Sequence, residues 1–456
     1  MTGMTNRFGS GIIKRSLAVC AVAGLLAACE TMDQPRGPVI TRPAPPPTVP
    51  YEPEPQEEVY NEEEFVTTEA LQVDGREPIR VALLLPFSST SENVKKVSEA
   101  MSNAAQLAVF ESGNDRFLLI SKDTKGTAEG AQAAAQEALR EGAELVLGPL
   151  FSDSVQAAAQ VTRAAGVPMI AFSSDMRIAG GGVYLLSFPP EMEIARLTDY
   201  AVKNGFMRFG LLTPLSEYGQ RVSSSFAEEA YVRGGIVVHE ERYEQSPDAM
   251  LQPAKRLAQY ADKCSSADNE ARLSNPMPGD PYASGSGGFQ AVLMPEQGTL
   301  LRALAPLLPY YDVNVNCIKL LGVSAWNNPR LTREPALAGG WFAAPDPSLS
   351  EKFRNQYSSV YGENPPRLAS LAYDAALLSA RLGLNPKGMR FVPQNIADPN
   401  GFLGADGLFR LTPDGRVERG LAILEIRQSG IRVVDPAPQS FIMTPAIDEY
   451  GGTTGF

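Results

Sequence analysis

Histidine is almost absent from this chain of 456 residues, because His239 is the only one. Histidine is the usual general base of an enzyme and a common zinc ligand, so its scarcity argues against both kinds of site. No Gly-x-Ser-x-Gly elbow, phosphate-binding loop or metal-ligand spacing occurs either. Asp123, Asp175 and Asp374 can in principle pair like glycosidase carboxylates, but exposed acids are usually only solvated. The sequence therefore predicts a protein with no catalytic residues, metal or cofactor.

The sequence also lacks an apolar run long enough to span a membrane. Its longest apolar run near the start, residues 17–28, follows Arg7, Lys14 and Arg15, which is the form of a secretory signal peptide. That run ends in Leu26-Ala27-Ala28-Cys29. The segment predicts export, and it contains Cys20, which would be removed with the signal.

Residues 26–29 resemble a bacterial lipobox, in which the cysteine becomes the lipid-modified first residue of the mature protein. The resemblance implies a lipid on Cys29 that anchors the protein to a membrane at the periplasmic face of the envelope. Glu30 differs from the Asp that retains enterobacterial lipoproteins at the inner membrane, so the outer membrane is favoured. The alternative is an ordinary signal peptide in which Cys29 occurs by chance.

Residues 29–77 show no hydrophobic period and are rich in Pro and Glu. Pro favours extended conformations and neighbouring Glu side chains repel each other, so we expect a disordered tether. It serves either to hold a domain far from its lipid anchor or only as a soluble spacer. The net charge is −12, the signal carries three basic residues, and residues 29–70 carry ten acids and two arginines, which leaves −7 for residues 71–456. This mild acidity, without a basic stripe, predicts no nucleic-acid binding.

From residue 78 onward, apolar runs alternate with segments of helical period. This alternation is typical of parallel, doubly wound α/β sheets. A first series ends at Pro189-Pro190, and a second series then restarts. The expected strands are 78–86, 116–123, 145–147, 167–174, 206–213, 236–243, 289–294, 318–323 and 340–344, and residues 407–434 are expected to form antiparallel strands around the turn Asp414-Gly415.

The clearest turn follows the apolar run at residues 145–147. Gly148-Pro149 ends this strand, and Ser152, Asp153 and Ser154 are residue types that cap a helix. Ligands of open α/β sheets bind at the carboxyl ends of the strands, where free helix N–H groups are available. Ser152 and Ser154 are therefore candidate ligand contacts, and the alternative is that Ser152 or Asp153 only caps the helix at 155–165.

Two doubly wound halves in series resemble the type I periplasmic binding proteins, in which the chain crosses three times between two lobes and ligands bind between them. The resemblance rests on the segment 78–86, the turn 148–154, Tyr218-Gly219-Gln220 and the segment 367–375. It implies the following organisation: a signal peptide at 1–28, a tether at 29–77, a binding-protein module at 78–435 with lobe 1 at about 78–189 and 324–405 and lobe 2 at about 190–323 and 406–435, and a flexible tail at 436–456.

Similarity to branched-chain amino-acid receptors implies where a ligand would bind. Ser152, Ser154, Ser173 and Ser174 match the hydroxyl-bearing turns of lobe 1, while Tyr218 and Glu296 match positions that face the cleft from lobe 2. The serines would bind a carboxylate and Glu296, expected to be partly exposed, would bind an ammonium group. The alternative is that Tyr218 only starts a helix and that Glu296 is a first-turn acid favoured by the helix dipole.

The lipobox, the segment Leu83-Leu84-Leu85-Pro86 and the run 147–154 look most like the penicillin-binding-protein activator lipoproteins. That resemblance implies an outer-membrane lipoprotein that stimulates a peptidoglycan synthase by direct contact. The longer members of that family carry an N-terminal helical-repeat domain where this chain has the tether. The second hypothesis is a solute receptor for an amino acid, a peptide or a cell-wall fragment.

Cys264 and Cys317 are the only cysteines left after removal of the signal and acylation of Cys29. Cys264 closes an expected helix at the amino-terminal edge of lobe 2, and Cys317 begins a strand at the same edge. An exported protein permits disulfides, so we expect these two residues to bond. The alternative is two separate buried thiols.

Overall fold

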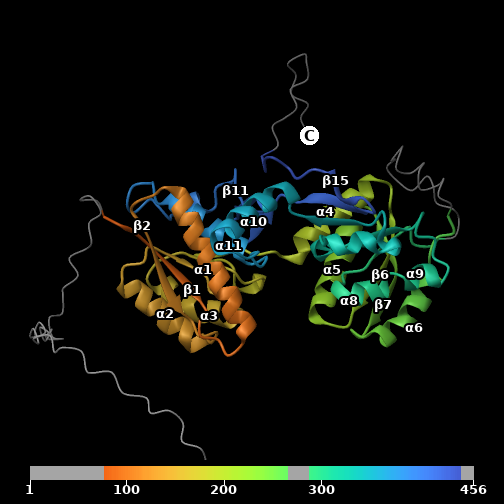
Figure 1. Ribbon diagram of the computed structural model, residues 1–456, viewed down its shortest axis with the longest axis horizontal. Helices are drawn as coiled ribbons and strands as arrows, with labels where there is room; N and C mark the ends of the chain where they lie inside the picture. Colours follow the sequence, from red (N-terminus) through yellow and green to blue (C-terminus); the bar gives the residue numbers. More distant parts are fainter. Residues whose placement is uncertain (1–76, 265–286, 443–456) are drawn as a thin grey trace, which may run out of the picture. The chain divides into compact units, whose positions relative to one another are not determined.

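A computed structural model of the chain describes residues 77–264 and 287–442 (Figure 1). These residues form two parallel α/β lobes, each with its own sheet and hydrophobic core. This agrees with the fold class expected from the sequence. Cys29, the tether up to residue 76 and the tail from residue 443 lie outside the described residues.

The sheet of the first lobe has five parallel strands in the order β2-β1-β3-β4-β5. Its inner strand β1, between β2 and β3, buries Val81 and Leu83 in one core and Ala82 and Leu84 in another, so it is apolar without alternation. The elements of this lobe are β1 (Ile79–Leu85), α1 (Glu92–Ser112), β2 (Phe117–Asp123), α2 (Ala128–Arg140), β3 (Leu145–Leu147), α3 (Ser152–Ala164), β4 (Met169–Ala171), η1 (Met176–Ile178) and β5 (Val183–Leu185).

The sheet of the second lobe has seven strands in the order β15-β14-β10-β9-β8-β6-β7, in which β14 runs antiparallel to both of its neighbours and all other neighbouring pairs are parallel. Helix α4 packs on α5, and α6 packs on α8 and α9. The elements are α4 (Pro190–Lys203), β6 (Arg208–Pro214), α5 (Glu217–Val232), β7 (Ile236–Tyr243), α6 (Pro247–Ala258), β8 (Ala291–Leu293), α8 (Gly298–Leu304), α9 (Leu307–Tyr310), β9 (Lys319–Gly322), η2 (Ser324–Trp326), η3 (Pro329–Arg333), η4 (Pro335–Leu337), β10 (Trp341–Ala344), β14 (Ala422–Arg427) and β15 (Gly430–Asp435).

The segment between β10 and β14 returns to the first lobe. Helix α11 (Ala369–Leu382) packs along α1, and Figure 1 shows α10 (Pro347–Tyr361) and α11 beside that helix. A small antiparallel sheet of β11 (Phe402–Gly404), β12 (Gly407–Leu411) and β13 (Val417–Arg419) joins the same core, after the short α12 (Pro393–Ile396). The expected turn at Asp414-Gly415 connects β12 to β13, and its Gly415 carbonyl accepts a hydrogen bond from the Leu185 N–H of β5 at 2.7 Å.

The boundaries of the lobes differ from the expected ones. Residues 324–344 were expected in lobe 1, but β10 pairs with β9 and β14 and belongs to the second sheet. Residues 406–419 were expected in lobe 2, but β12 and β13 pack in the core of the first lobe. Each of these segments joins the lobe in which it pairs or packs with residues distant in the sequence. The chain therefore crosses between the lobes three times, after β5, after β10 and after β13.

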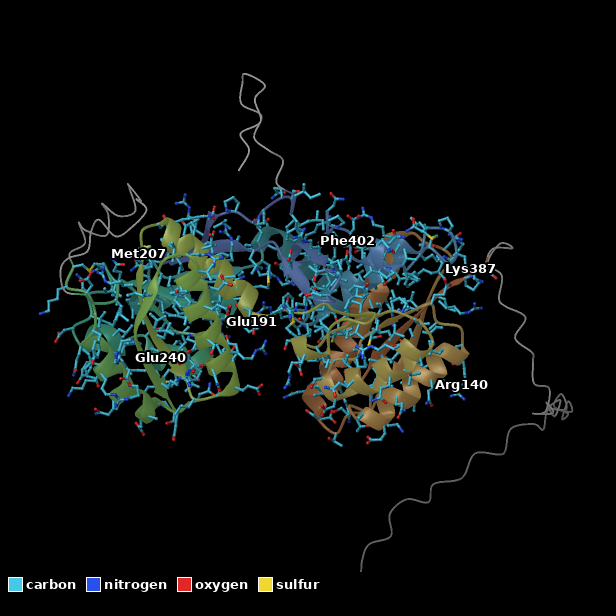
Figure 2. All side chains as sticks on the ribbon, turned by 180° about the vertical axis from the view of Figure 1, so that it is seen from behind. Arg140, Glu191, Met207, Glu240, Lys387 and Phe402 are labelled. Carbon is cyan, nitrogen blue, oxygen red and sulfur yellow. A yellow bond between two sulfur atoms is a disulfide. The ribbon has the colours of Figure 1, made fainter. Side chains whose placement is uncertain are left out.

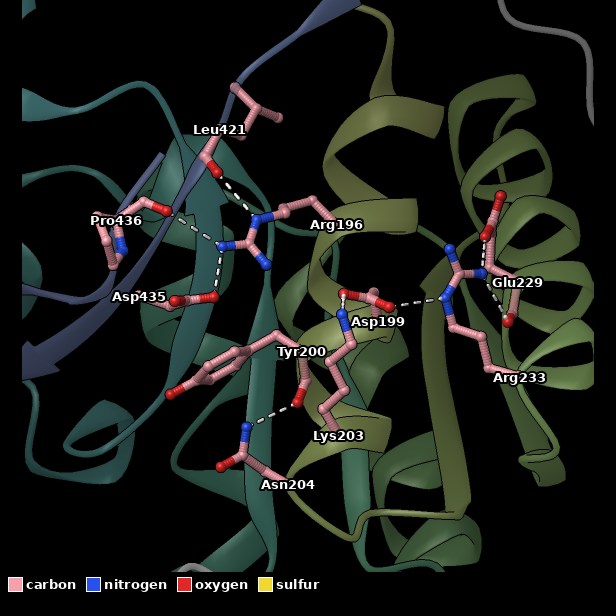
Figure 3. A network of polar contacts seen from close by, with 10 residues as sticks. All are labelled: Arg196, Asp199, Tyr200, Lys203, Asn204, Glu229, Arg233, Leu421, Asp435 and Pro436. Atoms are coloured by element: carbon pink, nitrogen blue, oxygen red, sulfur yellow. Dashed lines mark hydrogen bonds and ion pairs between the residues drawn. The ribbon is translucent and has the colours of Figure 1, made fainter. Parts of the chain in front are cut away.

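Polar contacts tie α4 to the third crossing (Figure 3). Arg196 donates from Nε to the Leu421 carbonyl at 2.9 Å and from Nη2 to the Asp435 carboxylate at 2.5 Å. Asp199 on the next turn pairs with Lys203 at 2.8 Å and with Arg233 of the segment after α5 at 3.5 Å. The first helix of the second lobe is thereby attached to β15, the last strand among the described residues.

Within residues 77–264 and 287–442, no helix has both the length and the apolar character that crossing a membrane requires.

Candidate functional site

The turn after β3 is held at the carboxyl edge of the first sheet by backbone contacts. Gly148 has a φ of +85°, and a Cβ at this position would lie 2.2 Å from the Leu84 carbonyl oxygen. Only glycine permits that approach between β3 and β1. The Pro149 carbonyl accepts from the Phe172 N–H at 2.9 Å, which places the start of α3 beside the end of β4.

Helix α3 begins one turn earlier than expected, and its N-terminus is not capped by a side chain. Phe151 is the N-cap residue, and Ser152 is the first helical residue. The interpretation that Ser152 or Asp153 only caps the helix is therefore wrong. The buried Ser154 hydroxyl donates to the Thr127 carbonyl at 3.2 Å, so this side chain links α3 to the start of α2.

Three of the four candidate serines line one cavity of about 810 Å³ between the lobes. Ser152 comes from the start of α3, and Ser173 and Ser174 follow β4. The Ser173 hydroxyl accepts from the Asp175 N–H at 3.2 Å, whereas Ser174 is exposed. Ser154 does not line this cavity.

The second lobe contributes charged side chains to the same cavity. Glu191 and Arg221, from α4 and α5, form an ion pair with distances of 2.8 and 3.0 Å from Nη2 and Nε to one carboxylate oxygen. Glu217 at the start of α5 also lines it. Figure 2 shows Glu191 at the end of α4 that faces the first lobe.

The first lobe adds the pair Asp175 and Arg177, in which both nitrogens lie 2.8 Å from the carboxylate oxygens. The hydrogen bond from Arg177 holds the pKa of the Asp175 carboxyl below its ordinary value, and the charge of Arg221 lowers that pKa further. Asp175 in turn raises the pKa of the Arg177 guanidinium, and Glu217 adds to this effect. Each lobe therefore brings an ion pair to the lining of this cavity.

Tyr218 and Glu296 line a second, smaller cavity of about 230 Å³ and do not line the larger one. Glu296 is 3% exposed, so the expectation of a partly exposed acid is wrong. Its Oε2 accepts from the Tyr243 hydroxyl at 3.0 Å and from Gln245 at 3.4 Å, and its Oε1 accepts from the Gln297 N–H at 3.0 Å. Burial, followed by the charge of Glu296, raises the pKa of Tyr243. Five of the six predicted ligand residues are thus divided between two cavities, and Ser154 lines neither of them.

Sequence reasoning missed a polar junction between the lobes at this smaller cavity. Arg367, just before α11, donates to the Ser324 hydroxyl at 2.6 Å and to the Glu193 carboxylate at 3.2 Å. The other Glu193 oxygen accepts from the Ser324 N–H at 2.8 Å. The Arg367 guanidinium also lies 4.2 Å from the centre of the Phe188 ring, and Arg419 lies 4.4 Å from the same ring. Arg367 begins the segment 367–375 on which the resemblance rests, but no local pattern indicates its partners, because they are more than 40 residues away.

The acids considered for catalysis do not converge. Asp175 lines the larger cavity. Asp123 instead accepts a hydrogen bond from the Ser88 hydroxyl at 2.5 Å, and Asp374 accepts one from the Ala405 N–H at 2.6 Å. Burial raises the pKa of Asp374 to about 7. His239 stacks on Tyr260 with ring centres 3.7 Å apart. Over residues 77–264 and 287–442, no group of three or more His, Cys, Asp or Glu residues could hold a metal ion.

Residues 78–261 match the model of a family described as periplasmic binding protein. An uncharacterized protein of Rickettsia prowazekii is 22% identical over 130 residues, which are 28% of this chain and 35% of that relative, so the match spans about a third of its length.

Two solved structures share the architecture of this chain. One is a branched-chain amino acid ABC transporter periplasmic ligand-binding protein from Burkholderia xenovorans, with 16% identity, a TM-score of 0.59, and coverage of 79% of this chain and 96% of that chain. The other is a branched-chain amino acid transporter substrate-binding protein from Streptococcus pneumoniae in complex with isoleucine, with 19% identity, a TM-score of 0.52, and coverage of 79% and 100%. The chain therefore has the two-lobed type I periplasmic binding protein fold.

Proposed function

We propose that the protein binds a small amino-acid-like solute, without catalysis, in the larger cavity between its lobes at the periplasmic face of the envelope. The observation that carries this proposal is the cavity of about 810 Å³ on which polar side chains of both lobes converge. Ligand sites of this kind are concave and contain a few placed polar groups. The similar structure from Streptococcus pneumoniae is a complex with isoleucine, and the likeness to periplasmic binding proteins supports a periplasmic location.

The chemistry of the walls fits a ligand with a carboxylate. Ser152 presents a hydroxyl at the first turn of α3, where the backbone N–H groups have no partners within the helix. Ser173 and Ser174 add hydroxyls from the end of β4. An ammonium group of the ligand would find Glu191 or Glu217 on the opposite wall.

Replacement of Ser152 by alanine is expected to weaken solute binding roughly 10- to 100-fold, because a hydrogen bond to a charged group contributes about 1.5–3 kcal/mol. The measurement is calorimetric titration of the full chain with the L-amino acids and with di- and tripeptides. Ser154→Ala is the matched control on the same helical turn, and it should leave the affinity unchanged because Ser154 binds Thr127 and not the cavity. Absence of binding by the unmutated protein across the whole panel would contradict the proposal.

A second candidate function is activation of a peptidoglycan synthase by protein contact. It is favoured by the resemblance of Leu26–Cys29 and residues 147–154 to the activator lipoproteins, and by Glu296, whose oxygens are satisfied within the protein. The two functions differ in their partner. Affinity capture of the protein from envelope membranes, followed by mass spectrometry, should recover a permease for a solute receptor and a bifunctional synthase for an activator.

We further propose that Cys29 carries the lipid anchor, preferentially in the outer membrane. Replacement of Cys29 by serine should then release the protein from membranes, because the variant lacks the acyl chains. Each buried methylene of those chains contributes about 0.8 kcal/mol to membrane binding, and two or three chains anchor a protein stably. Fractionation of cells with detection of the protein in soluble and membrane fractions measures this. A Ser variant that stays with the membrane would show that another feature holds the protein there.

A further inference from the structure

Glu296, the acid expected to bind the ammonium group of an amino acid, accepts hydrogen bonds from other residues of the protein. Both Glu296 oxygens accept hydrogen bonds, from Tyr243, Gln245 and the Gln297 N–H, and the side chain is 3% exposed. Glu296 also lines the smaller cavity and not the larger one. The larger cavity must therefore select its ligand by other groups.

Those other groups are charged side chains of both signs on both walls. Asp175 and Arg177 stand on the first lobe, with 17% and 85% of their side chains exposed. Glu191 and Arg221 stand on the second lobe, with 39% and 33% exposed. A ligand can reach all four, because each retains exposed surface and each lines the cavity.

Each wall of the cavity carries one ion pair, Asp175 with Arg177 on the first lobe and Glu191 with Arg221 on the second. Glu217 adds a further acid to the second wall. Each wall therefore offers a ligand both a positive and a negative group. Such a lining favours a ligand that carries ionised groups of both signs.

The size of the cavity agrees with a ligand longer than one amino acid. Its volume of about 810 Å³ lies toward the upper end of the range of roughly 300–1,000 Å³ found for sites that hold drug-sized ligands. Resting on the proposed function, we infer that the cavity selects short peptides with ionised side chains of both signs over free apolar amino acids.

The test is calorimetric titration of the full chain with three probes: L-leucine, the tripeptide Ala-Ala-Ala and the tripeptide Glu-Ala-Lys. Glu-Ala-Lys should bind at least tenfold more tightly than either of the others. Arg221→Gln should weaken that binding at least tenfold, because it removes the positive group of the second wall. Arg256→Gln is the matched control, since it removes an exposed ion pair with Glu241 away from the cavity and should change the affinity less than twofold.

The outcomes separate this inference from the function on which it rests. Leucine binding as tightly as Glu-Ala-Lys would overturn the selectivity and leave solute binding intact. Equal affinity of Arg221→Gln and the unmutated protein would show that the wall charges only pair with each other, and it would overturn their role in selection. No binding of any probe, or of the wider panel of amino acids and peptides, would overturn the proposed function itself.

Discussion

Replacement of Trp326 by alanine is expected to lower the free energy of unfolding of the second lobe by about 3–5 kcal/mol. The ring is fully buried, and the backbone of β9 packs directly on it, because a Cβ on Gly322 would lie 2.1 Å from the indole. Gly340 approaches the same ring, where a Cβ would lie 2.8 Å away. Glycines have no side chains to fill the space, so the variant retains a cavity. Equilibrium denaturation in urea, followed by circular dichroism, measures the loss.

The same side chain supports the smaller cavity. The indole N–H donates to the Glu296 carbonyl at 3.2 Å and so holds the turn between β8 and α8. Trp326→Phe keeps most of the ring and should cost less than Trp326→Ala, with the difference in free energy reporting the lost volume. Gly322→Ala should also destabilise, since its Cβ would overlap the ring. Unfolding of Trp326→Ala at the same urea concentration as the unmutated protein would contradict this account of the packing.

The central strands could be predicted because their burial is local in origin. Strand β1 is buried along nearly its whole length, and such strands read as unbroken apolar runs. The expected strand at 145–147 coincides with β3, which is buried along its whole length, and the expected helix at 128–142 agrees with α2 to within two residues. The spacing of apolar residues, together with the turn residues that interrupt it, is sufficient to predict elements of this kind from the sequence.

Lobe membership could not be read from the same patterns. Strand β10 has only four residues, and its position depends on pairing with β14, which begins nearly 80 residues later. The hairpin of β12 and β13 likewise reaches β5 through the contact of Gly415 with Leu185. Both placements arise from contacts between distant segments, which a single sequence does not encode in any local period.

The candidate site was only partly predictable for the same reason. Ser152, Ser173 and Ser174 follow strand ends, so the edge at which they lie follows from the direction of a parallel sheet. The hydrogen bond from Tyr243 to Glu296 joins residues 53 positions apart. The hydrogen bond from Arg367 to Glu193 joins residues 174 positions apart. The burial of an acid in such a network therefore cannot be predicted from the sequence pattern around that acid.

Loss of the bond between Cys264 and Cys317 is expected to lower the free energy of unfolding by about 4 kcal/mol, mainly by freeing the unfolded chain. The structure joins these two cysteines, whose Cα atoms are 6.1 Å apart and which are separated by 53 positions. Such a distance is ordinary for a disulfide. Cys317 is fully buried just before β9, at the end of the strand away from the larger cavity. The loss should therefore reduce stability without changing ligand contacts.

Thermal and chemical denaturation of Cys264→Ser, Cys317→Ala and the double variant measure this effect. Each single variant should lose a similar amount, because either removes the whole cross-link, and the double variant should be no less stable than the weaker single variant. Solute affinity at low temperature should match that of the unmutated protein, since Cys264 and Cys317 do not line the larger cavity. Titration of two free thiols in the denatured, unreduced protein would show that the bond is not formed, and the loss in the variants would then belong to packing of the buried Cys317 alone.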